Sequence, residues 1–404
     1  MDGLSADEVR YALRVVHGRT FALLPGIESD SQHGCGRQLR PNTDAELYSS
    51  ADGERVYAYG LKTCGSVWSC PVCSSRICYH RGEELQAAID GHVCAGGDVL
   101  LFTGTLPHHA GHSLYQVTEA VNEAWTYLRS GNPWRRWADR IGYLGAVRGI
   151  EATHGRNGWH AHVHAVLFLD RVADPRELVR FRRWCRKRWA RKIKSYLRAP
   201  LERGPDGTPR LARERAGSDV PLRDQLFGEP GRRYGVRISR GEHAGHYIAK
   251  MGLGKEAVRM EVKRGRGGNR TAWEILRDYA EREDPHDAAL WIEWCRTMKG
   301  RAHLVWSPHL RERIGTAQLD LFTDAELAAE PEPEEEDTLE LVVDRTLWWA
   351  VESRVHDPVS WFSYWIRGGA TGEEVARACE VLCSDMPRPG QVRHDPTSKR
   401  LWIV

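Results

Sequence analysis

The chain has 404 residues, of which 41% are hydrophobic and 28% charged, so it can bury a large core and is long enough for two or three domains. No apolar run approaches the roughly 18 residues of a membrane span, and the N-terminus lacks a charged-then-apolar secretory signal. These features argue against a membrane partner and predict a cytoplasmic protein. Its ten cysteines are therefore expected to be metal ligands or buried thiols rather than disulfides.

The net charge of +3 is unevenly distributed. Residues 324–340 carry nine acidic residues and no Lys or Arg, which leaves the rest of the chain at +12. We interpret residues 316–344 as a solvated acidic linker, because the stretch contains prolines and too few apolar residues to fold alone. The basic remainder favours a polyanionic partner.

Cysteines dominate residues 1–95, which we assign as an N-terminal zinc-binding region. Cys70 and Cys73 have the Cys-x-x-Cys spacing that lets two thiolates bind one zinc ion, and two earlier cysteines can complete a tetrahedron. The predicted ligands are Cys35, Cys64, Cys70 and Cys73. Cys78 and His33 are alternative ligands, and buried free thiols are the alternative to a metal site.

Residues 143–153 and 159–169 are predicted to form an antiparallel hairpin. The second strand reads GWHAHVHAVLFL, and the side chains of alternate residues in a strand point to the same face. Its alternating histidines are His160, His162 and His164. Glu151 on the first strand then lies almost opposite His162. Two imidazoles and a carboxylate, with coordination positions left open, suit a divalent metal that also grips a phosphate oxygen.

The remaining elements complete an α+β domain over residues 96–315. Further strands and helices are predicted at about 98–106, 235–239, 113–130 and 174–198. The second helix carries eleven Lys or Arg between Arg176 and Arg198 against Glu177 alone, with one apolar stripe, so its cationic face should attract phosphates. A Gly-, Pro- and charge-rich insertion follows at about residues 200–231.

A metal beside a basic helix suggests phosphoryl transfer, which needs a nucleophile. Tyr247 and Lys250 lie one helical turn apart on the same face of a predicted helix. A phenol ionises poorly at neutral pH, and Lys250 together with the metal can favour its ionised form. Tyr234 is the competing tyrosine.

Several motifs together resemble the HUH endonucleases. The pair His162-Val163-His164, the sequence YIAK and the upstream strand LLFTGTLPHH resemble the rolling-circle plasmid replication initiators that use a single catalytic tyrosine. The stretches CGSVWSCPVC, KRGRGGNRTAWEILRD and KGRAHLVWSPHLRERIG are also similar to that group. The resemblance covers about residues 30–315.

This resemblance implies metal-dependent, site-specific nicking and joining at a plasmid double-strand origin, through a 5′-phosphotyrosine and a free 3′-hydroxyl. Tyr247 matches the nucleophile, and His162 and His164 match the pair that binds Mg²⁺ or Mn²⁺. For the third ligand we expect Glu151, with His160 as the competitor.

Glu242 is the candidate base for a second cleavage. The implied fold is a central antiparallel sheet covered by helices on one side, with the histidine strand in the middle and Tyr247 on a helix facing it. Single-stranded DNA must be held at the metal. Trp159 is interpreted either as a stacking platform for an unpaired base or as a packed residue at the hairpin end.

Residues 345–404 lie outside the resemblance. They are predicted to form three helices and a hairpin, a small and mainly helical module of the winged-helix kind. The third helix begins with a capping box from Thr371 to Glu374. Its acidic charge favours protein contact, with a host helicase or another copy of the chain, over contact with a DNA groove.

Two other interpretations remain open. An HUH relaxase or transposase would share the chemistry but differ in substrate, although relaxases carry their tyrosine near the N-terminus and Tyr247 follows the histidines. A non-catalytic, zinc-bearing origin-binding protein would use the histidines only as a structural site. The sequence does not predict the oligomeric state.

Overall fold

The computed structural model describes residues 34–53, 56–198, 235–240, 268–316, 322–329, 332–355, 357–385 and 391–403. The chain forms two compact units. One unit comprises Met1–Ser74 with Phe322–Val404, and the other comprises Ser75–Leu321. Both contain helices and a largely antiparallel sheet, so the fold is α+β as predicted. Within these described ranges, no helix combines the length and apolar character needed to cross a membrane.

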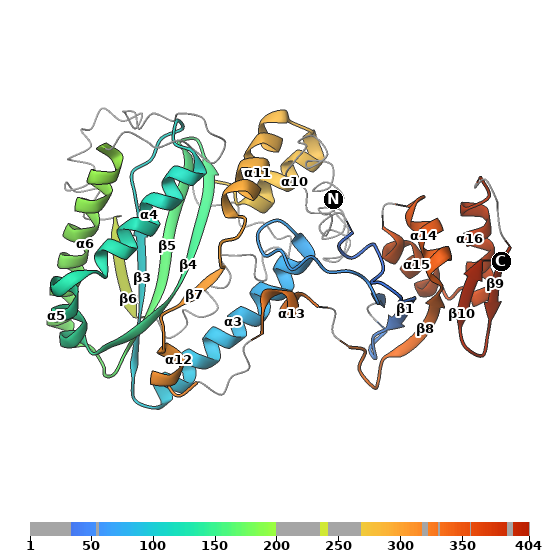
Figure 1. The fold of residues 1–404 in the computed structure, drawn as a ribbon, viewed down its shortest axis with the longest axis horizontal. Coiled ribbons are helices and arrows are strands. Elements are labelled where there is room, and N and C mark those ends of the chain that lie inside the picture. The colour runs from blue at the N-terminus through green and yellow to red at the C-terminus, as the bar shows by residue number, and fades with distance from the viewer. Residues whose placement is uncertain are drawn as a thin grey trace. The chain divides into compact units, whose positions relative to one another are not determined.

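Five antiparallel strands form the sheet of the second unit, in the order β6-β3-β5-β4-β7 (Figure 1). The strands are β3 (Asp98–Thr105), β4 (Tyr143–Gly155), β5 (Gly158–Leu169), β6 (Val236–Arg240) and β7 (Leu304–Trp306). The four strands predicted from the sequence lie within two residues of their observed bounds. The histidine strand β5 is the middle strand, as expected.

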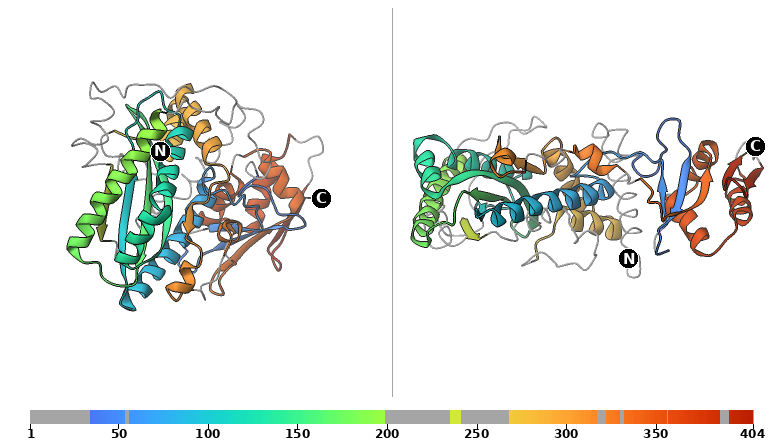
Figure 2. Two further views of the ribbon diagram at one scale, coloured as in Figure 1. Left: turned by 60° about the vertical axis from the view of Figure 1, so that its left-hand side comes forward. Right: turned by 90° about the horizontal axis from the view of Figure 1, so that it is seen from below.

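Helices cover one face of this sheet where it is most apolar. These helices are α4 (Leu114–Leu128), α5 (Gly131–Ile141) and α6 (Pro175–Arg198). The rings of Trp125 from α4 and Trp189 from α6 pack against Phe102 of β3, with centroids 5.2 and 5.7 Å away. Figure 2 shows α4 and α6 side by side over the strands. The predicted helices 113–130 and 174–198 are therefore confirmed.

A further helix, α3 (Pro71–Cys94), packs on the opposite face, whereas the sequence predicts helices on one side only. Leu85 and Ile89 of α3 form a buried cluster with Val99, Val166 and Phe168, which alternate with the residues under α4 and α6. Both faces therefore bury apolar side chains at this end of the sheet. The sequence prediction of a one-sided cover is wrong in this respect.

A helix pair packs beside the turn of the β4–β5 hairpin. It consists of α10 (Ala272–Arg282) and α11 (Pro285–Met298), and the short α12 (Leu310–Arg313) follows β7. Arg270, which pairs with the backbone of His154 in β4, makes ion pairs with Asp278 and Asp287 at 2.8 and 2.7 Å. Glu293 of α11 accepts a hydrogen bond from the indole of Trp159 in β5. These contacts fix the hairpin end that carries the histidines.

The first unit joins the two ends of the described chain in one sheet, in the order β2-β1-β8-β10-β9. Its strands are β1 (Ala45–Ser49), β2 (Val56–Tyr59), β8 (Thr338–Val343), β9 (Val392–Asp395) and β10 (Arg400–Ile403). Its helices are α13 (Asp324–Ala328), α14 (Arg345–Glu352), α15 (Pro358–Arg367) and α16 (Gly372–Leu382). Leu47, Val343, Leu347, Phe362 and Val375 are fully buried in its core.

This arrangement divides the chain differently from the four predicted regions. Residues 316–344 were expected to be a solvated linker. They contain β8, whose alternating apolar residues are buried and which pairs with both β1 and β10. Three helices and a hairpin follow as predicted, with the capping box at Thr371. However, their sheet continues into the N-terminal strands. Residues 345–404 are therefore not a separate winged-helix module, because β10 of their hairpin pairs with β8, which in turn pairs with β1.

Candidate functional site

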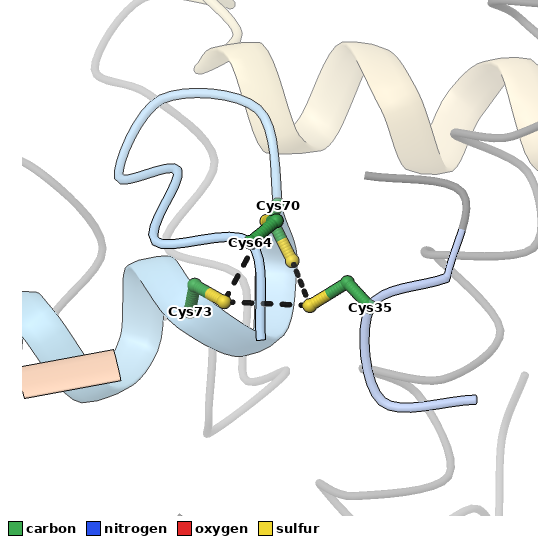
Figure 3. Close-up of side chains that lie close together, drawn as sticks. All are labelled: Cys35, Cys64, Cys70 and Cys73. Atoms are coloured by element: carbon green, nitrogen blue, oxygen red, sulfur yellow. Dashed lines mark hydrogen bonds between the residues drawn. The ribbon is translucent and has the colours of Figure 1, made fainter. Parts of the chain in front are cut away.

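Four cysteines converge in the first unit (Figure 3). The sulfur of Cys35 lies 3.5 Å from that of Cys70 and 3.4 Å from that of Cys73, and the sulfurs of Cys64 and Cys73 are 3.7 Å apart. Zinc–thiolate bonds of about 2.3 Å would place tetrahedral ligand atoms about 3.8 Å apart. The cluster is therefore close to the dimensions of a zinc site, and it can hold such an ion.

Local backbone geometry explains how distant cysteines meet. Gly36 and Gly65 directly follow Cys35 and Cys64 and have φ angles of 65° and 64°, in the left-handed region that favours glycine. Each chain segment can thus turn sharply after its ligand. The other two cysteines flank the start of α3, where Pro71 occupies the first helical position and needs no hydrogen-bond partner for its nitrogen.

Hydrogen bonds link the four thiols. Hydrogen bonds from Cys35, Cys64 and Cys70 hold the pKa of the Cys73 thiol well below its usual value, although burial opposes this. Cys70 shows the reverse effect: hydrogen bonding and burial raise its pKa well above the usual value. The arrangement therefore favours one thiolate among thiols, and a cation is the group that would let more of them ionise.

The histidine row follows the predicted register in the second unit. Glu151 pairs directly with His162, and Gly149 and Thr153 pair with His164 and His160. Glu151 and all three imidazoles therefore lie on one face of the sheet. The carboxylate of Glu151 is 3.4 Å from Nε2 of His164, so it reaches the histidine diagonal to its own partner.

Two threonines on β3 orient this row, and sequence reasoning missed them. Thr103 pairs with His164, and its hydroxyl is 3.0 Å from Nδ1 of that ring. The hydroxyl of Thr105 is 2.7 Å from Nε2 of His160, whose Nδ1 lies 3.3 Å from Nε2 of His162. Both nitrogens of His160 are thus engaged, which favours a role in orienting His162 over a role as ligand. The sequence did contain a signal for these threonines. In FTGT (102–105) they alternate along β3, just as the histidines alternate in HAHVH (160–164) on the paired strand β5.

Electrostatics at the row suit a cation. Burial lowers the pKa of His160 to about 3 and that of His162 to about 4, so both rings are neutral at pH 7. Burial opposes ionisation of Glu151, but its hydrogen bond with His164 and the neighbouring imidazoles outweigh burial and lower its pKa. Nδ1 of His162 is buried and has no hydrogen-bond partner within the described residues. A carboxylate and neutral imidazoles are the donors that a divalent metal takes.

The row is nevertheless less compact than the cysteine cluster. The four cysteines are the only group in the described ranges whose donor atoms come together closely enough to surround an ion as they stand. The rings of His162 and His164 are stacked, with centroids 5.5 Å apart. The residues therefore fit a metal by donor type, and their side chains must rotate to converge on one point.

The basic helix α6 lies on the other side of the sheet from the histidines. Its Trp189 packs over Phe102 and donates to the carbonyl of Thr105, whereas the side chain of Thr103 reaches His164 on the opposite face. The expectation of a metal beside this helix is therefore wrong, because adjacent residues of β3 point to opposite faces. The cationic ridge of α6 consists of Arg176, Arg180, Arg183, Lys187 and Arg191, all exposed.

A different cation shares the face of the histidines. Arg237 of β6 is exposed and pairs with Thr103, which places it two strands from His164. Neighbouring strands are about 4.8 Å apart, so a phosphate between Arg237 and His164 is within reach of the long arginine side chain. Sequence reasoning missed this residue, although it alternates with the buried Val236 and Ile238.

Trp159 is a packed residue. Only 2% of it is exposed, its indole donates to Glu293 at 2.9 Å, and its ring stacks on Trp294. The interpretation of Trp159 as a platform for an unpaired base is therefore wrong, and its alternative is confirmed. Further predicted features lie outside the described residues: Tyr247, Lys250, Glu242, Tyr234, His33 and the insertion 200–231.

Two relatives give these features a context. The chain is 28% identical over 327 residues to Protein rep of Streptomyces lividans, an alignment that covers 69% of each protein. It is 32% identical over 156 residues to the Neomycin resistance protein of Streptomyces cyanogenus, which covers 32% of this chain and 36% of that protein. No family model and no solved structure matches the chain. The chain is thus similar to a Rep protein over most of its length.

Proposed function

We propose that this protein is a plasmid rolling-circle replication initiator that nicks and rejoins one strand at the double-strand origin. The observation that supports it best is the placement of Glu151, His162 and His164 on one face of the central hairpin, in a chain similar to Protein rep. Carboxylate and imidazole donors on a rigid sheet suit chemistry at a phosphodiester. Origin DNA, single- and double-stranded, is the proposed partner.

These three residues would hold Mg²⁺ or Mn²⁺, which polarises the scissile phosphate and stabilises its developing charge when bound. Thr103 keeps His164 in one orientation, and His160 does the same for His162. Arg237 would bind a non-bridging phosphate oxygen on the same face. The protein thereby fixes the phosphodiester before any bond changes.

Tyr247 is the proposed nucleophile. Its phenolic oxygen attacks the phosphorus, the bond to the 3′ oxygen breaks, and that oxygen takes up a proton to become the free 3′-hydroxyl. The DNA remains attached through a 5′-phosphotyrosine. Lys250 would stabilise the ionised phenol, and Glu242 would act as base in a second cleavage that ends the round.

A second candidate function is supported by one observation. Among the described residues only the cysteines form a compact ligand group, which favours a zinc-bearing origin-binding protein without catalysis. An HUH relaxase or transposase would share the proposed chemistry and differ in its DNA. A host helicase is a further proposed partner, through α16, whose first turn carries Glu373 and Glu374.

Nicking of supercoiled DNA tests the proposal. The substrate is a plasmid bearing the DNA that flanks the gene of this protein, incubated with Mg²⁺ or Mn²⁺. We expect open-circular product with covalently bound protein, and mass spectrometry of the DNA-linked peptide should identify Tyr247. Intact plasmid with bound but unlinked protein would instead establish the non-catalytic function.

The matched variants are Tyr247→Phe and Lys250→Ala. Tyr247→Phe removes one oxygen atom and should reduce nicking by about 10⁴ or more while DNA binding persists. Lys250→Ala removes only charge stabilisation and should cost about 10² to 10³ in rate. An adduct on Tyr234, or full activity in Tyr247→Phe, would overturn the assignment.

A further inference from the structure

A cleft in the first unit combines positive charge with an exposed aromatic ring. It has a volume of about 510 Å³ and is lined on one side by the segments that carry Arg37 and Lys62, and on the other by α14. Trp349, on α14, is 60% exposed at this cleft. An exposed indole offers a flat ring on which an unpaired base can stack.

The charged side chains that line the cleft are mainly positive. Among the residues that the structure describes, four cationic side chains line it against the single carboxylate of Glu352: Arg37, Lys62, Arg345 and Arg354. Glu352 lies 3.7 Å from Arg37, while Lys62 donates to the neutral amide of Gln38 and has no ion pair among the described residues. The partner of Arg354 is Asp385, whose side chain is 72% exposed and therefore a weak, solvent-screened neutralising group.

Arg345 and Trp349 share one face of α14. They are four residues apart in the helix, so their side chains lie one above the other along its axis. Arg345 is exposed and makes no side-chain ion pair within the part of the chain that the structure describes. Nε of Arg37 is buried and lacks a hydrogen-bond partner among the same residues. Arg345 is therefore available to an acceptor from outside the chain, whereas Arg37 is partly neutralised by Glu352.

The cysteine cluster holds one wall of the cleft in place. Arg37 and Lys62 are each two residues from a cluster cysteine, Cys35 and Cys64 respectively. Lys62 bonds through its backbone to Gly36 and Gln38, at 2.7 Å in both cases. The other wall is tied on by the indole of Trp348, which donates to the carbonyl of Arg37 at 2.7 Å.

We propose that this cleft binds a short segment of unpaired DNA, with a base stacked on Trp349 and phosphates on Arg345, Arg37 and Lys62. An exposed ring stacks only on a base that is not already stacked in a duplex, which selects a single strand. Cations around the ring match the phosphates on either side of that base. The choice of DNA rests on the proposed function, and the cleft is a second contact separate from the histidine row.

Binding of a fluorescein-labelled twelve-nucleotide oligothymidine, measured by anisotropy without Mg²⁺ or Mn²⁺, tests this site in the full chain. Trp349→Ala should weaken binding about tenfold, and Trp349→Phe, which keeps a stacking surface, by less than about threefold. Arg345→Ala should reduce the slope of log affinity against log salt by about 0.7. Tyr364→Ala and Arg393→Ala, at exposed positions outside the cleft, are the controls and should bind as the wild type does.

Three outcomes would overturn the site. The first is unchanged affinity in both Trp349→Ala and Arg345→Ala; the second is displacement of the oligonucleotide by polyglutamate at equal charge, which would indicate an acidic peptide ligand. The third is photo-crosslinking of an iodouridine oligonucleotide to peptides other than the one containing Trp349. Since no cleavage is measured, Tyr247→Phe should bind normally, so failure of this site and failure of the nicking proposal are distinguishable.

Removal of the metal is an independent test. Chelation that lowers zinc content should weaken oligothymidine binding in parallel, because Arg37 and Lys62 would lose their fixed spacing. Restored zinc should restore the affinity. Unchanged binding by fully zinc-free protein would show that the cysteine cluster does not shape this cleft.

Discussion

Glu151 lies directly opposite His162 in the β4–β5 pair, yet its carboxylate contacts His164, 3.4 Å away. The right-handed twist of paired strands brings diagonal neighbours within reach of long side chains. The carboxylate is therefore near both histidines of the predicted metal pair, with its side-chain contact to His164. Because its pKa is lowered despite burial, it carries charge at neutral pH where a cation would bind.

The first prediction ranks the three histidines. His162→Ala or His164→Ala should abolish nicking and leave binding to duplex origin DNA intact, since that binding depends mainly on the basic surface. His160→Ala should be milder, because both nitrogens of His160 already bond within the protein. Gel assays of nicking and of duplex binding measure both effects. If His160→Ala reduced nicking as much as His162→Ala or His164→Ala, the metal ligands would be misassigned.

The second prediction concerns Thr103. Thr103→Val keeps the shape of the side chain but removes the hydroxyl that orients His164. We expect the Mg²⁺ or Mn²⁺ concentration for half-maximal nicking to rise by about 10- to 100-fold, the usual cost of losing a group that orients a ligand. Thr126→Val, at an exposed hydroxyl on α4, is the matched control. No change in the metal requirement would exclude this role for Thr103.

The third prediction concerns the cysteine cluster. Purified wild-type protein should contain one zinc ion per chain under reducing conditions, and Cys70→Ser should lower both zinc content and stability more than it affects chemistry at the histidines. Cys94→Ser, at an exposed cysteine outside the cluster, should change neither. Elemental analysis together with thermal unfolding tests this. Less than about half a zinc per wild-type chain would contradict it.

Local patterns predicted much of the second unit. Alternating residues gave the β4–β5 hairpin and the pairing of Glu151 with His162, because register follows from the turn and from which face is buried. The face covered by α6 could not be predicted in the same way. It depends on whether Phe102 or Thr103 points toward that helix, which only long-range packing decides.

The fold of the first unit is harder to predict from the sequence than that of the second. β1 and β8 are separated by more than half of the chain, and nothing in either short strand specifies the other as its partner. An acidic, proline-containing stretch before β8 also resembles a linker in composition. The pairing is stabilised by burial of Leu47 and Val343 in a core shared with α14. Such a core is a property of the assembled sheet rather than of any one segment.

The fourth prediction concerns acid stability. Burial is the main cause that lowers the pKa of His154 and of His112 to about 4, from 6.5 in the unfolded chain. Between pH 6.5 and 4 the unfolded state therefore binds more protons, so the free energy of unfolding should fall as the pH falls through this window. His154→Gln should reduce that loss by about 1 to 3 kcal/mol, allowing for partial exposure.

Urea unfolding followed by tryptophan fluorescence at pH 7, 5.5 and 4 measures this effect. His80→Gln, at an exposed position on α3, is the control and should keep the wild-type pH dependence. The same pH dependence in His154→Gln and in the wild type would mean that His154 is not buried in its neutral form.

The last prediction concerns the ridge on α6. Arg180 and Lys187 project from the helix face opposite its buried stripe, and that helix lies across the sheet from the histidines. Combining Arg180→Ala with Lys187→Ala should weaken duplex DNA binding about tenfold, and reduce its salt dependence by about 0.9 for each phosphate that the variant no longer neutralises. The nicking rate at saturating DNA should stay unchanged, because neither side chain can reach a phosphate held by the histidine row.

The pair Arg296→Ala and Lys299→Ala removes the same charge from exposed positions on another part of the second unit and should have little effect. A fall in the saturated rate as large as the fall in affinity would place the ridge at the reaction centre and refute the separation of the two surfaces by the sheet.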